Sequence, residues 1–174
     1  MSATPAFSRP DAAIALRPMR ATDLDGVLAV QRRCYRPELI ESRAALASRH
    51  RLAPDTCWVA ARDGALLGYL FAHPWQGEAP PALDAPLAAL PAMADTLFIH
   101  DLALHPDARG LGLGPRLVDA ALAAGRARGL VRSRLVAVQG ADAFWSRFGY
   151  RAARLAPAKL ARYGDDAVGM ARAL

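Results

Sequence analysis

The sequence is poor in cysteine and lysine and has no long apolar run. Its two cysteines, Cys34 and Cys57, are far apart and form no CxxC pair, so neither a disulfide framework nor a thiolate zinc site is predicted. Both are expected to pack as small hydrophobic residues, with a reactive thiol as the alternative. Lys159 is the single lysine, which argues against Schiff-base catalysis.

No segment approaches the ~18 to 20 uninterrupted apolar residues of a membrane span. The N-terminus also lacks the basic start and apolar run of a secretory signal. We therefore expect a cytoplasmic protein with no membrane partner.

The charge balance is basic. Twenty-two Lys and Arg residues face 16 Asp and Glu residues, giving a net charge of +6. This favours anionic partners such as nucleic acid, a phosphorylated cofactor or an acidic surface. The arginines are spread from Arg9 to Arg172 and form no stripe with aromatic residues, which argues against a dedicated nucleic-acid surface.

The length of 174 residues and the 53% hydrophobic content fit one globular domain. We expect a flexible tail over residues 1–12 and a domain over 13–174. A strand is predicted over 14–19, followed by a helix opened by a Thr22–Asp25 capping box. The Arg36-Pro37 pair should end this helix, and a second is predicted over 38–50.

The strongest local signal is a hairpin, with strands over 56–62 and 65–73 joined by an Asp63-Gly64 turn. Residues 75–95 carry four prolines and are predicted to be irregular, either a variable surface loop or a lid or wall over a substrate site. The remaining expected elements are a strand over 96–104, a helix over 115–128, a strand over 134–138, a short helix over 141–148 and strands between 150 and 172. This order indicates a mixed α/β sheet in which the late βαβ unit requires parallel pairing.

A glycine-rich loop follows the strand at 96–104 and opens the next helix. Gly110, Gly112 and Gly114 would let the backbone approach a ligand, and the unpaired N–H groups of the helix start would bind phosphate. Arg109, at the entrance of the loop, would add a positive charge that binds the same phosphate. The loop lacks the Gly-Lys-Ser/Thr ending of a P-loop and comes too late in the chain for a dinucleotide fingerprint. The alternative is a tight turn that only satisfies packing.

The spacing Arg109-x-x-Gly112-x-Gly114 after a Leu-Ala-Leu strand end resembles the acyl-CoA-binding motif of the GNAT superfamily of N-acetyltransferases. The segment AVQGADAFWSRFGYR, residues 137–151, is similar to a second signature of that family. The resemblance spans roughly residues 14–174. It implies a single-domain α/β fold whose mixed, mostly antiparallel sheet is flanked by helices, with a bulged fourth strand that splays from the fifth.

The resemblance also implies acetyl-CoA as co-substrate, no metal, and direct attack by a primary amine in a ternary complex. The backbone of the splayed strand would pair with the pantetheine arm, and the following loop would hold the pyrophosphate. The expected cofactor-binding residues are Leu102, Ala103, Leu104, Arg109, Gly110, Leu111, Gly112, Leu113 and Gly114. Pro115 is expected to alter the phosphate contacts slightly, because it removes one N–H donor.

His100 is the predicted general base, because it precedes the expected thioester site and its usual pKa is near neutral. Its position resembles that of a histidine in arylalkylamine N-acetyltransferases. The alternative is a purely structural histidine. Strand alternation predicts that Asp101 and His105 point away from it, so neither a direct Asp101–His100 pair nor a two-histidine metal site is expected. His50 and His73 are interpreted as surface or strand-end residues.

The general acid for the departing thiolate is left unassigned. Relatives that use a tyrosine for this step have it where this sequence has Trp145, and an indole N–H is not a useful acid. Trp145 is therefore expected to wall the acyl pocket. Solvent, Tyr150 or Tyr163 would supply the proton.

The sequence does not identify the acceptor of the acetyl group. A small arylalkylamine or polyamine, an antibiotic, an amino acid and a protein N-terminus all remain candidates. Glu38, Glu41 and Asp101 would either hold a cationic amine or be solvated surface charges. The competing functions are a non-catalytic acyl-CoA sensor and an Arg-rich nucleic-acid-binding module. A homodimer is also compatible with the sequence.

Overall fold

The computed structural model describes residues 13–174, so the tail predicted over 1–12 lies outside the described part of the chain. Seven strands form one sheet in the order β1-β2-β3-β4-β5-β7-β6. The strands are β1 (Ala15–Pro18), β2 (Trp58–Arg62), β3 (Ala65–Trp75), β4 (Thr96–Leu104), β5 (Arg132–Ala137), β6 (Arg151–Ala152) and β7 (Val168–Ala173). Among them β4 and β5 are parallel and the other neighbours antiparallel, as expected.

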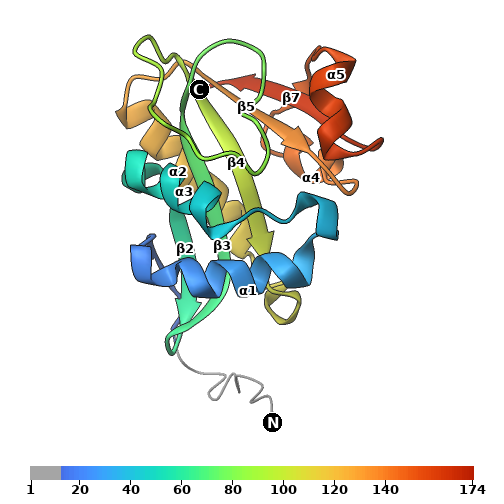
Figure 1. The fold of residues 1–174 in the computed structure, drawn as a ribbon. Coiled ribbons are helices and arrows are strands. Elements are labelled where there is room, and N and C mark those ends of the chain that lie inside the picture. Colours follow the sequence, from blue (N-terminus) through green and yellow to red (C-terminus); the bar gives the residue numbers. More distant parts are fainter. Residues whose placement is uncertain (1–12) are drawn as a thin grey trace.

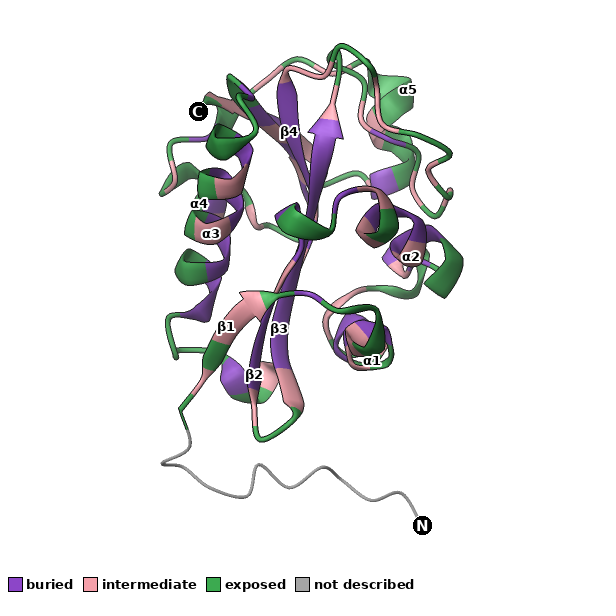
Figure 2. Cartoon of the chain, turned by 90° about the vertical axis from the view of Figure 1, so that its left-hand side faces the viewer, coloured by how far each residue is buried: buried purple, intermediate pink, exposed green. Residues whose placement is uncertain are grey.

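Helices cover both faces of the sheet (Figures 1 and 2). The α-helices are α1 (Leu24–Cys34), α2 (Arg43–Leu52), α3 (Leu113–Ala127), α4 (Asp142–Ser146) and α5 (Pro157–Leu160). Short 3-10 helices cover Ala21–Asp23, Pro37–Leu39, Pro54–Thr56, Pro106–Ala108 and Ala161–Tyr163. One core lies between the sheet and α1 and α2, and the other between the sheet and α3 and α4. Burial of apolar surface on both faces makes β3 and β4 almost wholly buried (Figure 2).

The predicted hairpin is confirmed. Strands β2 and β3 pair in antiparallel register around Asp63 and Gly64, whose φ angles are +49° and +79°. Two consecutive residues with positive φ are what a two-residue turn of the I′ type requires, and the Asp-Gly pair adopts that conformation at little cost.

The starts of the first two helices differ from the prediction. The predicted Thr22–Asp25 capping box does not form. Instead, the Asp23 carboxylate accepts a hydrogen bond of 2.7 Å from the Arg20 N–H and is held by the Arg17 guanidinium. Helix α2 begins only at Arg43, because the Ser42 hydroxyl caps it by accepting from the Ala45 N–H.

Strand β4 carries a bulge at His100. In the pairing with β3, Ile99 lies opposite Ala72 and Asp101 opposite Phe71, so His100 is the extra residue. The insertion breaks the strict alternation of side chains. The prediction that His100 and Asp101 point to opposite faces is therefore wrong: both face the α1 and α2 side, where their hydrogen-bond partners lie.

The predicted splay of the two central strands is also present. Strand β5 pairs with β4 only from Thr96 to Ile99, although β5 itself continues to Ala137. The edge of β4 beyond the bulge, residues 100–104, is left without a β-strand partner on that side. This gap between two parallel strands positions the candidate site.

Candidate functional site

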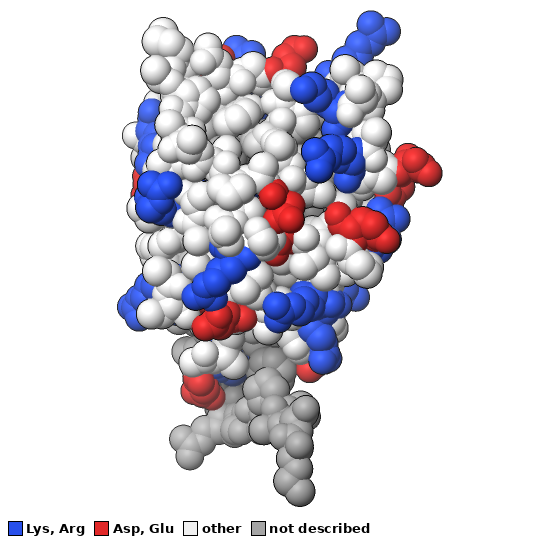
Figure 3. Space-filling model, viewed as in Figure 1, with Lys and Arg blue, Asp and Glu red and all other residues white. Residues whose placement is uncertain are grey.

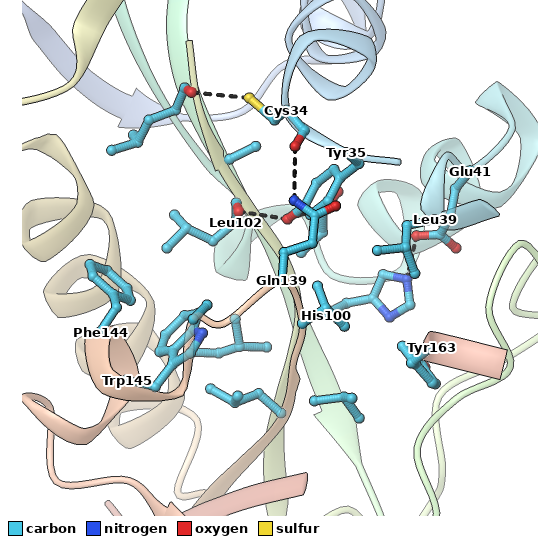
Figure 4. Close-up of a pocket in the computed structure, with 18 of the residues that line it drawn as sticks. Cys34, Tyr35, Leu39, Glu41, His100, Leu102, Gln139, Phe144, Trp145 and Tyr163 are labelled. Carbon is cyan, nitrogen blue, oxygen red and sulfur yellow. Dashed lines mark hydrogen bonds and ion pairs between the residues drawn. The ribbon is translucent and has the colours of Figure 1, made fainter. Parts of the chain in front are cut away.

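A cavity of about 430 Å³ opens at the splay between β4 and β5. Its walls come from six parts of the chain: the C-terminal half of β4, Arg109 beyond that strand, the end of α1 with the turn that follows it, the segment from β5 into α4, the irregular segment between β3 and β4, and Tyr163. Figure 4 shows these walls converging on one space, with Phe144 and Trp145 on one side and Leu39, Glu41 and His100 on the other.

The structure brings the predicted base and part of the predicted cofactor-binding set together. His100, Leu102, Ala103, Leu104 and Arg109 all line the cavity. The glycine loop that follows, residues 110–114, lies outside the cavity lining at the start of α3. A ligand that reached both places would extend from the splay to the start of α3.

The glycines of this loop have different roles. Gly110 and Gly112 have φ angles of +82° and +68°, and a Cβ placed on either would meet nothing within 4 Å. The space above them is open, as a backbone phosphate cradle requires. Gly114 instead faces Phe144, whose ring would lie 3.2 Å from an added Cβ. Gly114 therefore permits close packing of α3 against α4.

His100 forms a buried pair with Glu41. His100 Nε2 lies 2.6 Å from Glu41 Oε1, and neither side chain has more than 2% of its surface exposed. Burial raises the Glu41 pKa, but His100 and Arg49 outweigh it and the Glu41 pKa is lowered. The expectation that Glu41 is a solvated surface charge is wrong, because a carboxylate with these partners is stable inside the protein.

The two nitrogens of His100 differ. With Glu41 ionised, Nε2 carries the proton of this hydrogen bond, and in the neutral imidazole Nδ1 is then the nitrogen with the free lone pair. Nδ1 is buried and has no hydrogen-bond partner among the described residues. In Figure 4 the ring is drawn between Leu39 and Tyr163, both of which line the cavity. The ring is thus held in one orientation by Glu41 and has one free basic atom.

Arg49 connects this pair to the segment between β3 and β4. The guanidinium is fully buried, lies 3.6 Å from Glu41 and donates to the carbonyls of Ala82 and Ala85. Ser48 accepts from the Leu87 N–H nearby. Since Leu83 lines the cavity, this proline-rich segment forms part of its wall and is held there by Arg49 and Ser48.

His73 is not the surface or strand-end residue expected from the sequence. Its side chain is fully buried in β3, and its ring centroid lies 6.1 Å from that of His100. Burial, helped by the electrostatic interaction with His100, lowers the His73 pKa to about 3. His73 is therefore neutral and packs behind His100.

Asp101 is a buried carboxyl held by two tyrosines, and the expectation of a surface charge is again wrong. Tyr35 Oη lies 2.6 Å from Asp101 Oδ1, and Tyr69 Oη lies 2.7 Å from Oδ2. Burial raises the Asp101 pKa to about 6, although both hydroxyl contacts act in the opposite direction. Glu38, the third acidic candidate, is exposed.

Of the three aromatic residues considered from the sequence, Trp145 and Tyr163 line the cavity and Tyr150 does not. Trp145 is 6% exposed, lines the cavity and meets Phe144 edge to face. Tyr150 is buried outside the cavity lining, with its hydroxyl 2.6 Å from Ser133 Oγ and its pKa raised by burial to about 12. Tyr163 lines the cavity but donates its hydroxyl to the Pro81 carbonyl.

Two residues of the site escaped the sequence analysis. Gln139 crosses the splay: its amide donates to the Cys34 carbonyl and accepts from the Arg36 N–H, which ties the end of α1 to the segment after β5. Tyr35, the second residue, follows α1 directly and lines the cavity. A positive φ of +53° at Gln139 sets its backbone apart, but no feature of the sequence singles it out.

On the face in Figure 3, Lys and Arg side chains are dispersed and acidic side chains lie among them. Across residues 13–174, no helix is long and apolar enough to cross a membrane. Nor does this part of the chain hold a group of three or more metal-ligating His, Cys, Asp or Glu residues.

Comparison with known families decides the identity of the domain. The model of the acetyltransferase (GNAT) family matches residues 24–150, which include the splayed strands, the glycine loop and α4. The chain belongs to the GNAT family. A search of curated proteins finds no significant match to this sequence.

Solved structures of GNAT proteins share the fold at low sequence identity. The GphF GNAT-like decarboxylase in complex with isobutyryl-CoA is 23% identical, with a TM-score of 0.75 over 91% of this chain and 98% of that one. The PaiA N-acetyltransferase from Thermoplasma acidophilum, in complex with coenzyme A, is 16% identical, with a TM-score of 0.68 over 93% and 99%. The ribosomal-protein-S18-alanine N-acetyltransferase from Escherichia coli is 16% identical, with a TM-score of 0.66 over 92% and 94%.

Proposed function

We propose that this GNAT protein transfers an acetyl group from acetyl-CoA to a primary amine, by direct attack of the amine in a ternary complex. The observation that carries the proposal is the cavity itself. One side of the cavity is the part of β4 that β5 leaves without a strand partner, towards the glycine loop. The other side holds His100, whose Nδ1 has no hydrogen-bond partner among the described residues. Binding of the donor and removal of a proton from the acceptor would then occur within one space.

The donor side suits an acyl-CoA. Leu102, Ala103 and Leu104 offer a strand edge that a pantetheine arm would extend, since amide groups pair with an open edge as a further strand does. Arg109 and the N–H groups of residues 110–114 suit the pyrophosphate, because Gly110 and Gly112 leave the space above them open. The bound complexes of PaiA with coenzyme A and of GphF with isobutyryl-CoA support this assignment.

His100 is proposed as the general base. Glu41 holds the ring through Nε2–H, which leaves Nδ1 to take a proton from an ammonium substrate, directly or through one water, so that the neutral amine attacks. The His100 side chain is fully buried behind the surface of the cavity that it lines, so proton transfer requires the amine or a water to enter the lining next to Nδ1. Burial at this place would shield the neutral amine from bulk water while it attacks.

The acceptor side favours an amine with an apolar body. Leu39, Leu83 and Tyr163 supply its apolar surface. Glu41 and Asp101 are the carboxylates among the described lining residues, and both already have partners. A second cationic group would therefore find no free counter-charge there, and burying it would be costly. Of the acceptors left open by the sequence, a small arylalkylamine fits best.

The proposal is tested by following CoA release from acetyl-CoA with phenethylamine, spermidine, glycine and a short peptide. Phenethylamine is expected to give the highest kcat/KM and spermidine a much lower one. Preference for spermidine would contradict the assigned acceptor class. No CoA release with any amine, together with tight acetyl-CoA binding in a calorimetric titration, would favour the acyl-CoA sensor.

Binding to duplex DNA tests the remaining alternative. A nucleic-acid-binding module would bind with an affinity that falls steeply as salt rises, because phosphate contacts release counterions. We expect weak binding that acetyl-CoA does not change.

A further inference from the structure

The Tyr35 hydroxyl is within hydrogen-bond distance of two acceptor oxygens but has only one proton to donate. It lies 2.6 Å from Asp101 Oδ1 and 2.7 Å from the carbonyl oxygen of Leu102. A phenol carries one proton, so it donates to one of these oxygens only. With Asp101 ionised, the other short contact would hold two oxygen atoms together with no proton between them.

A proton on Asp101 resolves this conflict. Asp101 Oδ1–H then donates to the Tyr35 oxygen, and Tyr35 donates to the Leu102 carbonyl. Tyr69 donates to Asp101 Oδ2, so every contact in the group has one proton. Burial supports this arrangement, since it raises the Asp101 pKa to about 6 and the Tyr35 pKa well above its usual value. The hydrogen bonds thus run from Asp101 through Tyr35 to Leu102.

The end of this chain lies where the reaction is proposed to occur. Leu102 belongs to the stretch of β4 that β5 does not reach, and Tyr35 and Leu102 both line the cavity. In Figure 4 the Tyr35 hydroxyl lies at Leu102, with Phe144 and Trp145 to the left and His100 to the right. It therefore faces the space between the donor wall and the proposed base.

We propose that Tyr35 is the general acid that protonates the departing CoA thiolate, and that Asp101 resupplies its proton. This inference rests on the proposed acetyl transfer. In this proposal Tyr35 is the catalytic residue, because it gives its proton directly to the sulfur. Asp101 acts through Tyr35 and is a positioning residue.

The protons and electrons of the reaction balance. Before attack, an ammonium substrate gives one proton to His100 Nδ1, and the neutral amine nitrogen then forms the new C–N bond while the C–S bond breaks and its electron pair goes to sulfur. The surplus proton that the nitrogen carries after attack leaves to solvent, while the Tyr35 proton passes to sulfur and the Asp101 proton to the Tyr35 oxygen. Turnover leaves protonated His100 beside ionised Asp101, and exchange with solvent after product release restores both.

Other charged groups also act on Asp101. Glu41 raises its pKa and His100 lowers it, in addition to the two tyrosine contacts. Cys34 and Arg49 interact electrostatically with it from α1 and α2. The Asp101 proton is therefore lost as pH rises through about 6, and we expect wild-type kcat to fall over that range.

The kinetic test compares Tyr35→Phe and Asp101→Asn with Tyr69→Phe. Tyr69 contacts the same carboxyl but lies outside the cavity lining, so it is a matched control. With acetyl-CoA and phenethylamine we expect Tyr35→Phe to lower kcat by about 10²-fold or more at unchanged acetyl-CoA affinity. Asp101→Asn should lower kcat and remove its alkaline decline. Tyr69→Phe should change kcat by only a few-fold.

Equal losses in Tyr35→Phe and Tyr69→Phe would overturn the proposal, as would an alkaline decline in kcat that persists in Asp101→Asn. No CoA release by wild-type protein would instead overturn the acetyl transfer itself, and the role of Tyr35 with it.

Infrared spectroscopy tests the proton position without turnover. We expect the carbonyl stretch of an un-ionised carboxylic acid in the wild-type protein at about pH 5.5, its loss by about pH 8 and its absence from Asp101→Asn. Asparagine keeps the shape of the side chain and a donor toward Tyr35, so this variant should fold. A wild-type spectrum without the band at about pH 5.5 would overturn the proposal.

Discussion

Glu41 Oε1 lies 2.6 Å from His100 Nε2, while Oε2 of the same carboxylate lies 3.6 Å from Arg49. One buried anion therefore balances the arginine that holds the cavity wall and orients the histidine proposed as base. The stability of the wall and the chemistry of the site are coupled through Glu41.

This coupling predicts a large stability loss in Glu41→Gln. The variant keeps the size of the side chain but leaves Arg49 buried without a counter-charge, which costs about 3 to 5 kcal/mol when a buried pair is broken. Urea denaturation at neutral pH would measure the loss. Asp166→Asn is the control, because its pair with Arg36 is exposed, and it should change stability little. Equal effects in the two variants would mean that Glu41 contributes no more than a surface charge.

The raised pKa of Asp101 predicts that the folded protein becomes less stable as pH rises. The Asp101 pKa is about 6 in the folded protein against 3.8 for an ordinary Asp carboxyl, so the folded state binds more protons between these values. Stability is therefore lost as pH rises from about 4 through 6, by about 3 kcal/mol in total from this group. Asp101→Asn should remove this component. Urea denaturation of both proteins at several pH values gives the difference, and parallel pH profiles would contradict the raised pKa.

The glycine loop is tested by Gly112→Val. A branched side chain at this position would fill the open space assigned to phosphate, so acetyl-CoA affinity should fall sharply. Positive φ at Gly112 also strains the variant. Gly64→Val is the matched control, since Gly64 has φ +79° and open surroundings but lies in the β2–β3 turn. A calorimetric titration in which both folded variants bind acetyl-CoA like the wild type would remove the loop from the binding site.

Trp145 is proposed to shape the pocket without donating a proton. Trp145→Phe keeps an aromatic ring against Phe144 and Tyr150, so turnover with a good amine should be largely preserved. Steady-state kinetics would measure it. A drop in kcat of about 100-fold or more at unchanged KM, the size of a general-acid effect, would show that Trp145 participates in proton transfer.

The sequence predicted the parts of the fold that depend on local signals. Asp63-Gly64 specifies its own turn, and the glycine loop marks the start of α3 to within two residues of Pro115. The family motif added the splay, which no local pattern of residues 96–104 and 132–137 indicates. Gly114 carried part of that motif, yet it faces Phe144.

The buried polar groups could not be predicted in the same way. Glu41 and His100 are 59 residues apart, and only the packing of the turn before α2 against β4 brings them together. The bulge at His100 also defeats strand alternation, because one extra residue moves Asp101 to the same face. Bulges and long-range charge pairs depend on tertiary structure, and the residues around them looked like ordinary surface charges.

The assignment of His100 as the base is tested by the pH profile of kcat/KM for wild type and His100→Gln, with thermal melting and acetyl-CoA binding measured beside it. We expect His100→Gln to fold, bind acetyl-CoA and lose about 10² to 10⁴-fold in kcat/KM at neutral pH. The loss should shrink as pH rises, because more of the amine arrives neutral. An acidic limb that persists unchanged in His100→Gln would contradict the assignment, since the titrating base would then lie elsewhere.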